Sequence, residues 1–173
     1  MNLIKPIFCF LLMLGSTSIL SAQNIIPLPE HPRPDFERTD WINLNGSWKF
    51  TFNQELASKA IQSGAIDQLD MDIRVPFGWG SKLSGVPDGG DIGWYGREVQ
   101  IPEEWKGKRV YLVVGASEWD TQVWFDGQEL GSHRGGYTPF EFELTGRVQS
   151  GKKQNLIVRA DDTASDQRLD GKQ

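Results

Sequence analysis

After residue 40 the chain is a series of short apolar stretches separated by turn-forming residues. Apolar and polar residues alternate in 48–52 (W-K-F-T-F), 121–125 (T-Q-V-W-F) and 140–144 (F-E-F-E-L). A period of two predicts half-buried β-strands. Residues 94–101, 109–114 and 155–160 are rich in aromatic or β-branched residues and predict three more strands. The nearly continuous apolar run in 109–114 (R-V-Y-L-V-V) favours a place in the middle of a sheet.

The connections between these stretches also indicate an all-β protein. Asp126-Gly127 lies between 121–125 and 128–131, and this dipeptide between strands predicts a two-residue hairpin turn. Only 54–66 and 102–105 are compatible with helix, and both are short. Many short strands with few helices predict a single antiparallel β-sandwich.

The first 22 residues have the layout of a secretory signal peptide. Lys5 precedes the apolar run 7–14 (I-F-C-F-L-L-M-L), and small residues follow as far as Ala22. The run is too short to span a membrane, which takes about 20 residues. We expect cleavage after Ala22 and a secreted or periplasmic protein with no membrane attachment. Cleavage would remove Cys9, the one cysteine, which excludes a disulfide, a zinc–thiolate site and a cysteine nucleophile.

Length and charge exclude two further classes of protein. A (β/α)₈ barrel takes about 250 residues, more than the 173 of this chain. The formal net charge of −5 gives no basic face for nucleic acid. Four prolines in 25–35 predict an extended lead-in over residues 23–40, ahead of the sandwich domain at 41–173.

The acidic residues show no catalytic arrangement. Glu103 and Glu104 are neighbours and point in different directions, while Glu141 and Glu143 fit the wet face of a strand. No G-x-S-x-G or H-E-x-x-H motif occurs. The four aspartates in 161–170 lack the glycine and the terminal glutamate of a calcium loop. We therefore assign no catalytic residue, no metal site and no cofactor.

The aromatic content points to carbohydrate. The chain has seven Trp, nine Phe and three Tyr, and flat aromatic faces pack against the C–H faces of sugar rings. Position on alternating strands predicts that four of them are in the core, namely Trp48, Trp124, Phe140 and Phe142. Trp79 is different, because it lies in a Gly- and Pro-rich loop, 75–85. It is a candidate wall of a sugar site, or else an anchor of that loop.

In this order the segments resemble the N-terminal sugar-binding domain of glycoside hydrolase family 2, which contains β-galactosidases, β-glucuronidases and β-mannosidases. Seven stretches carry the resemblance, and their order makes it strong: 41–50 (W-I-N-L-N-G-S-W-K-F), 75–77 (V-P-F), 93–95 (G-W-Y), 105–116, 123–131 (V-W-F-D-G-Q-E-L-G), 135–145 and 171–173 (G-K-Q).

The resemblance implies a jelly-roll-like sandwich of the galactose-binding-domain type. It also implies that the parent protein is a retaining β-glycoside hydrolase, β-galactosidase-like in the first instance, that takes part in carbohydrate metabolism. In that family the two catalytic glutamates lie in a barrel that follows an immunoglobulin-like domain. None of the carboxylates of this chain receives those roles, and the chain alone is expected to be non-catalytic. Its expected partners are a β-glycoside and those two domains.

The resemblance further implies that two loops of the domain reach the sugar. One precedes the G-W-Y motif and makes Asp91 a substrate-binding candidate, and the other contains Lys172 and Gln173. Charged and amide side chains suit hydroxyl recognition because they offer several donors and acceptors. The alternative that Asp91 and Lys172 are ordinary loop residues stays open.

The family continues past G-K-Q into a further strand with a G-I-W-like turn. We therefore expect that residues 41–173 form a sandwich truncated before its last strand, that the chain is a fragment of a larger enzyme, and that it is marginally folded alone. A free-standing secreted carbohydrate-binding module or lectin is the alternative, and a purely scaffolding domain is a third possibility.

Overall fold

The computed structural model describes residues 26–163 except 32, 34 and 36, so the signal-peptide prediction lies outside the described residues. The elements in chain order are β1 (Gly46–Thr51), α1 (Gln54–Ser63), η2 (Ile66–Gln68), β2 (Met71–Val75), β3 (Ile92–Gln100), η3 (Glu103–Trp105), β4 (Tyr111–Val114), β5 (Asp120–Phe125), β6 (Gln128–Arg134), β7 (Phe140–Glu143) and β8 (Lys153–Asp161). The two short helical predictions, at 54–66 and 102–105, are confirmed as α1 and η3.

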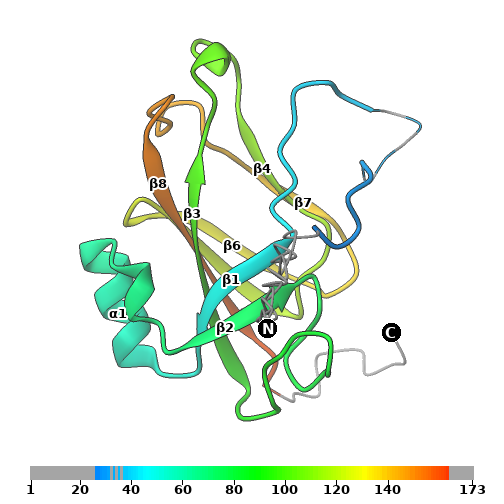
Figure 1. The fold of residues 1–173 in the computed structure, drawn as a ribbon, viewed down its shortest axis with the longest axis vertical. Coiled ribbons are helices and arrows are strands. Elements are labelled where there is room, and N and C mark those ends of the chain that lie inside the picture. The colour runs from blue at the N-terminus through cyan, green and yellow to red at the C-terminus, as the bar shows by residue number, and fades with distance from the viewer. Residues whose placement is uncertain (1–25, 32, 34, 36, 164–173) are drawn as a thin grey trace, which may run out of the picture.

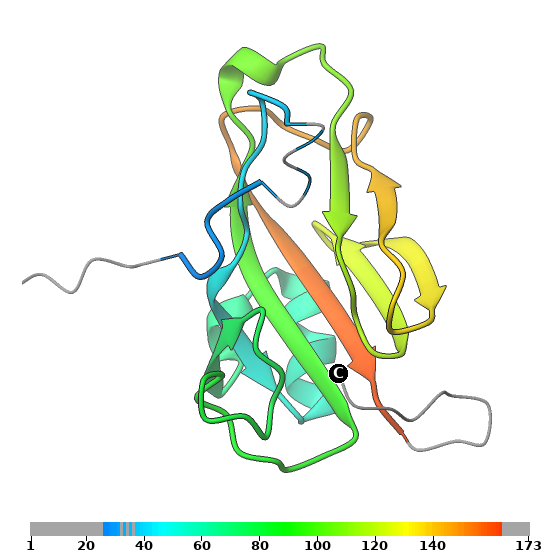
Figure 2. The same cartoon turned by 90° about the vertical axis from the view of Figure 1, so that its right-hand side faces the viewer.

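The strands form two antiparallel sheets. Six of them make a large sheet in the order β2-β1-β3-β8-β5-β6, and β4 pairs with β7 in a second sheet (Figures 1 and 2). The second sheet packs against one face of the large sheet, which we call the inner face. The predicted antiparallel, jelly-roll-like sandwich is confirmed.

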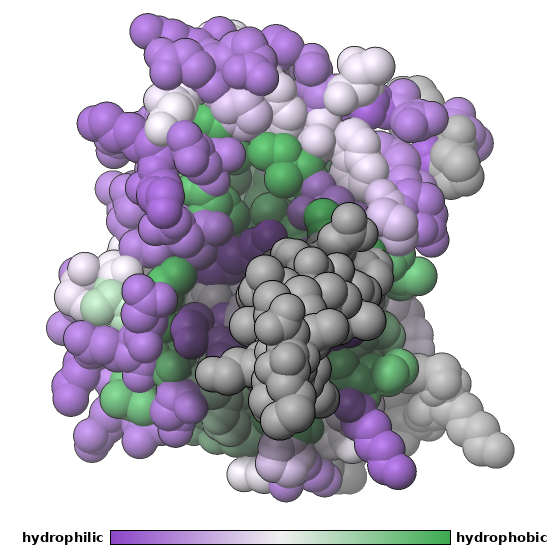
Figure 3. Space-filling model, viewed as in Figure 1, coloured by the Kyte–Doolittle hydropathy of each residue, from purple (hydrophilic) through white to green (hydrophobic). Residues whose placement is uncertain are grey.

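The main core fills the space between the inner face and the second sheet. Phe50, Val123, Phe125 and Leu156 point into it and are at most 2% exposed. Trp48 also belongs to this core, as its alternation predicted, and the partly buried Phe142 of β7 packs against it from the second sheet. The described surface has few large exposed apolar side chains, and the face in Figure 3 is mostly hydrophilic, with hydrophobic residues visible in a hollow.

The predicted central position of 109–114 is wrong. The strand is shorter, Tyr111–Val114, and it pairs with β7 in the two-stranded sheet. Leu112 is buried in the core, but the next residue, Val113, faces outward and is 60% exposed. The apolar run therefore reflects one buried face and one apolar residue on the outer face of a small sheet. β2 (M-D-I-R-V) was missed, although its apolar residues alternate and Ile73 is buried.

The turn signal between β5 and β6 takes the expected geometry. Asp126 and Gly127 have φ of 51° and 78°, so the predicted hairpin turn between β5 and β6 is confirmed as one with two left-handed residues.

The lead-in is held to the domain by two side-chain amides: Asn43 donates to the carbonyl of Leu28 and Asn45 to that of Pro27. Among the described residues no helix has the length and apolarity needed to cross a bilayer.

Helix α1 packs on the opposite face of the large sheet, the outer face. Asn53 caps its first turn by accepting from the N–H groups of Glu55 and Leu56, and Gly64 ends it in the left-handed conformation. Its small residues Ala57 and Ala60 are fully buried. With η2 they form a second apolar cluster over Trp94 and Ile157 of the sheet. The helix covers only part of the outer face.

Candidate functional site

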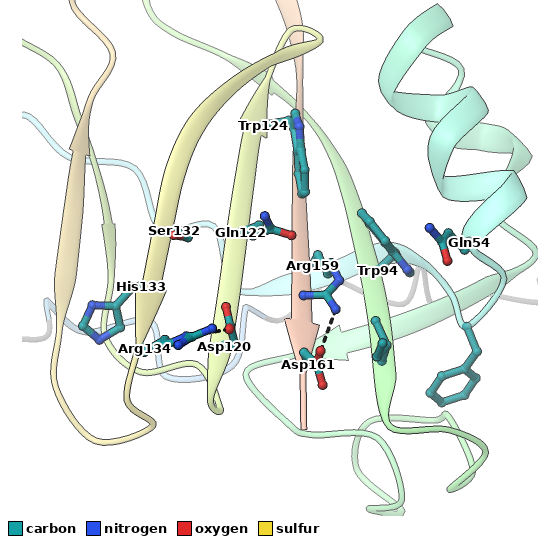
Figure 4. A pocket seen from close by; sticks show the side chains of 12 residues that line it. Gln54, Trp94, Asp120, Gln122, Trp124, Ser132, His133, Arg134, Arg159 and Asp161 are labelled. Carbon is teal, nitrogen blue, oxygen red and sulfur yellow. Dashed lines mark hydrogen bonds and ion pairs between the residues drawn. The ribbon is translucent and has the colours of Figure 1, made fainter. Parts of the chain in front are cut away.

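The part of the outer face that α1 leaves uncovered contains a cavity of about 640 Å³, the outer-face cavity (Figure 4). Strands β3, β8, β5 and β6 form its floor, and the start of α1 lies at one side. Because neighbouring strands are in register, side chains from successive strands stand side by side in rows. The rows determine what the cavity can bind.

The first row crosses the end of the sheet and contains Ile92, Asp161, Asp120 and Arg134, each the strand partner of the next. The Nε group of Arg134 donates to Asp120 Oδ2 at 2.8 Å. Asp161 is neutralised from the next row, where Arg159 Nη2 donates to its Oδ2 at 2.6 Å. The row therefore holds two carboxylates, each with its own guanidinium.

The second row lies one step further into the sheet and contains Trp94, Arg159, Gln122 and Ser132. The guanidinium carbon of Arg159 lies 5.8 Å from the centroid of the Trp94 ring. Its side chain is 17% exposed, and that of Asp161 is 21% exposed. The aromatic ring and the carboxylate thus hold a mostly buried guanidinium in one position.

Trp124 closes the cavity on the side of α1. Its ring centroid is 5.6 Å from that of Trp94 at an interplanar angle of 34°. We predicted Trp124 to be in the core; it does pack against buried residues, but against the second cluster on the outer face, and it also lines the cavity. His133 lines the rim and is stacked on Phe140 at 4.2 Å, so its ring points away from the row residues in Figure 4.

The electrostatics of the cavity are fixed by these ion pairs. Partial burial acts to raise the pKa of Asp161, but hydrogen bonds from Thr163 and Arg159 outweigh it and hold the pKa below its ordinary value. Asp161 is therefore ionised at neutral pH. The pair serves as a permanent dipole in the cavity wall and not as a proton donor.

The remaining polar groups of the cavity are uncommitted. The side chains of Gln54, Gln122 and Ser132 make no hydrogen bond to the described protein. Amide and hydroxyl groups supply both donors and acceptors. Together with the two tryptophans they give the cavity an apolar wall and convergent hydrogen-bonding groups, a combination suited to a ligand that has hydroxyl groups and C–H faces.

The sequence matches a family model, that of the glycosyl hydrolases family 2, sugar binding domain, over residues 42–163. The chain belongs to this family. The match includes every strand of both sheets and every side chain that lines the outer-face cavity.

Similar proteins carry the names of two enzymes. A β-glucuronidase of Bacteroides fragilis is 34% identical over 122 residues, which are 69% of this chain and 16% of the relative. A β-galactosidase of Thermoanaerobacter pseudethanolicus is 38% identical over 67 residues, 39% of this chain and 9% of the relative. The chain thus spans less than a fifth of the length of these two relatives.

The fold is shared with solved structures. A crystal structure of Ruminococcus gnavus β-glucuronidase in complex with uronic isofagomine aligns with a TM-score of 0.61 and 24% identity, over 70% of this chain and 21% of that one. At this identity the likeness establishes the fold of the family 2 sugar-binding domain.

The structure places Trp79 on the inner-face side of the sheet. Its ring is half-buried and lies 5.8 Å from that of Phe50, 5.9 Å from that of Phe52 and 6.2 Å from that of Tyr95. Trp79 thus anchors its loop, and it is not among the residues that line the outer-face cavity. A sugar contact by Trp79 stays a prediction.

Asp91 is exposed at the start of β3, next to Ile92 of the cavity. Its carbonyl accepts a hydrogen bond from the N–H of Asp162 at 2.7 Å, which joins the G-W-Y loop to the end of β8. Its carboxylate is not part of the cavity lining. Its role as a sugar contact stays a prediction, and Lys172 and Gln173 lie outside the described residues.

Sequence reasoning missed most of the cavity. Gln122, Arg134 and Arg159 were not singled out, and Asp161 was considered only for calcium; the described residues contain no metal-binding group of three or more His, Cys, Asp or Glu. One signal was available. In β8 the continuous apolar run L-I-V gives way to the alternation R-A-D, which marks where one face of the strand turns from buried to polar.

Proposed function

We propose that this chain is the non-catalytic sugar-binding part of a secreted retaining β-glycoside hydrolase. The observation that carries the proposal is the family match across 42–163, which covers the whole described sandwich. The partners proposed for it are a carbohydrate and the immunoglobulin-like and barrel domains of the enzyme.

The chain itself is proposed to lack hydrolytic activity. Glycoside hydrolysis takes two carboxyl groups that flank the bond, one of them free to donate a proton. In the outer-face cavity Asp120 and Asp161 are each held by an arginine. We expect the purified chain to release no nitrophenol from nitrophenyl β-D-glucuronide or β-D-galactoside. Turnover that copurifies with the chain and resists further purification would contradict the proposal.

The substrate class of the parent enzyme is proposed from its relatives. We expected a β-galactosidase from the sequence, but among the similar proteins the name β-glucuronidase is more common than the name β-galactosidase. We therefore place β-glucuronides first and β-galactosides second. Rates of the parent enzyme on the two nitrophenyl glycosides, measured side by side, would decide the order.

Secretion is proposed from the N-terminal 22 residues alone. The expected result is a mature protein whose first residue is Gln23, found outside the cytoplasm. Determination of the N-terminal sequence of the protein isolated from its source checks this, and a protein that retains its first residues in the cytoplasm would contradict it.

A free-standing carbohydrate-binding module is the second candidate, favoured by the outer-face cavity, which one sandwich builds without help from another domain. This candidate requires the chain alone to unfold cooperatively and to bind a sugar. Thermal unfolding with and without sugar tests both requirements, because a ligand that binds only the folded state raises Tm.

A further inference from the structure

We infer that the outer-face cavity binds an uncharged sugar unit, with Gln122 at the centre of the binding surface. The inference rests on the proposed function and adds to it a location and a ligand class. It separates this site from recognition of a glucuronate carboxylate, which would need a cation that is free to pair.

The charged side chains of the cavity favour an uncharged ligand. Its lining contains two arginines and two aspartates, and both arginines are engaged: Arg159 with Asp161 and Arg134 with Asp120. An incoming carboxylate would have to displace an aspartate and would be repelled by it at close range. A hydroxyl group meets no such obstacle, because it can accept from a guanidinium and donate to a carboxylate in the same position.

The side-chain amide of Gln122 is placed to bind hydroxyl groups of a sugar. Gln122 stands in the second row between Arg159 of β8 and Ser132 of β6 (Figure 4). It makes no hydrogen bond to the described protein, so its donor and acceptor are both available. An amide between a guanidinium and a hydroxyl is suited to the vicinal hydroxyls of a pyranose, each of which both donates and accepts.

The wall of the cavity offers an apolar surface for a sugar ring. Trp124 is partly buried and borders the cavity, and behind it Trp94, 7% exposed, packs against its ring. An indole backed in this way is rigid and offers an apolar surface to the C–H face of a sugar. The cavity volume of about 640 Å³ lies inside the range of roughly 300–1,000 Å³ that is usual for small-ligand sites.

The test compares two sugars that differ at one group. Methyl β-D-glucopyranoside carries a hydroxymethyl group where methyl β-D-glucuronide carries a carboxylate. The ¹⁵N-labelled chain is titrated with each, and the side-chain amide and indole N–H signals are followed. We expect the glucoside to shift the signals of Gln122 and Trp124, and the glucuronide to bind at least about threefold more weakly. Equal or tighter binding of the glucuronide would overturn the ligand class.

Two variants test the location. Gln122→Ala removes the central amide, and we expect it to weaken glucoside binding about three- to tenfold, as loss of a hydrogen-bonding partner does. Gln128→Ala is the control, because Gln128 is an exposed amide on the same hairpin that does not line the cavity. Thermal unfolding of both variants verifies that they are folded.

The outcomes separate the inference from the proposed function. Binding by the wild-type chain that Gln122→Ala does not alter, or signal shifts confined to the loop around Asp91, would overturn the location and leave the function standing. If neither methyl glycoside binds to the folded chain, the inference fails and the sugar-binding role of this chain fails with it. The face would then be a surface for another domain.

Discussion

The two faces of the large sheet are built from the same strands but are completed differently. The inner face is mainly apolar and is closed by the β4–β7 pair. The outer face is closed only where α1 lies, and its other half carries charged and amide side chains. One sheet thus supplies both the stability of the domain and its candidate ligand surface, through alternate residues of each strand.

Strand β8 shows the division within nine residues. Leu156 and Val158 pack on the inner face throughout, while the outer-face residues change from Ile157 under the helix to Arg159 and then Asp161 in the cavity. Substitutions on the inner face should therefore lower the free energy of unfolding. Substitutions in the half of the outer face that α1 leaves uncovered, which we call the open half, should alter binding more than folding.

The largest effect is expected for Phe50→Ala. Phe50 is fully buried, and its ring lies 4.9 Å from those of Phe52 and Tyr95. Truncation of a buried aromatic leaves a cavity and costs about 3–5 kcal/mol of unfolding free energy. Urea unfolding measures the loss. Val113→Ala, an exposed apolar truncation on β4, should change stability by less than about 0.5 kcal/mol; similar losses in both variants would show that the inner face is not the main core.

A pair of glycines on β3 compares the faces directly. A Cβ at Gly93 would lie 2.7 Å from the Phe50 and Trp79 rings on the inner face, and one at Gly96 would lie 2.8 Å from Leu69 Cδ1 on the outer face. Rigid rings cannot yield, whereas a leucine methyl can rotate. We expect Gly93→Ala to cost about 1–3 kcal/mol and Gly96→Ala less, by chemical denaturation. The reverse order would contradict the assignment of the tighter packing to the inner face.

Loss of the helix cap should have a smaller effect. Asn53 Oδ1 accepts from the N–H of Glu55 at 2.8 Å and from that of Leu56 at 3.3 Å. Asn53→Ala should cost about 1 kcal/mol and reduce the helical circular dichroism before the sheet unfolds. The exposed Gln62→Ala in the same helix should be close to neutral. An equal loss in both would mean that the cap does not hold α1 on the outer face.

The sequence was informative about the sheet because periodicity reports directly on one-sided burial. The alternation of 48–52 and 121–125 predicted β1 and β5, and Asp126-Gly127 predicted the turn after β5. The continuous run at 109–114 misled, because apolar residues on both faces of a strand do not say how large its sheet is. Order along the chain also does not reveal that β8 lies between β3 and β5.

The candidate site was also hard to predict from the order of residues along the chain. Its residues come from four strands and one helix start, and they become neighbours only through the register of the sheet. Arg159 and Gln122 each look like ordinary polar strand residues in sequence. The glycine-rich loop around Trp79 made this residue a candidate sugar contact, yet its ring turns toward the inner-face aromatic residues.

The smallest effect is expected for Asp161→Asn, and it depends on pH. The folded pKa of Asp161 lies below its ordinary value, so the group adds stability that is complete above the unfolded pKa of about 3.9 and is lost as pH falls through the folded pKa. At neutral pH the variant should be less stable by about 1 kcal/mol or less, and the difference should shrink toward zero in acid, where the wild-type carboxyl is also uncharged. Asp72→Asn, which breaks the exposed pair with Lys49, should lose still less. Urea unfolding of the three proteins across the acid range measures these differences, and a gap between wild type and Asp161→Asn that widens in acid would mean that the Arg159–Asp161 pair does not fix the charge of the open half.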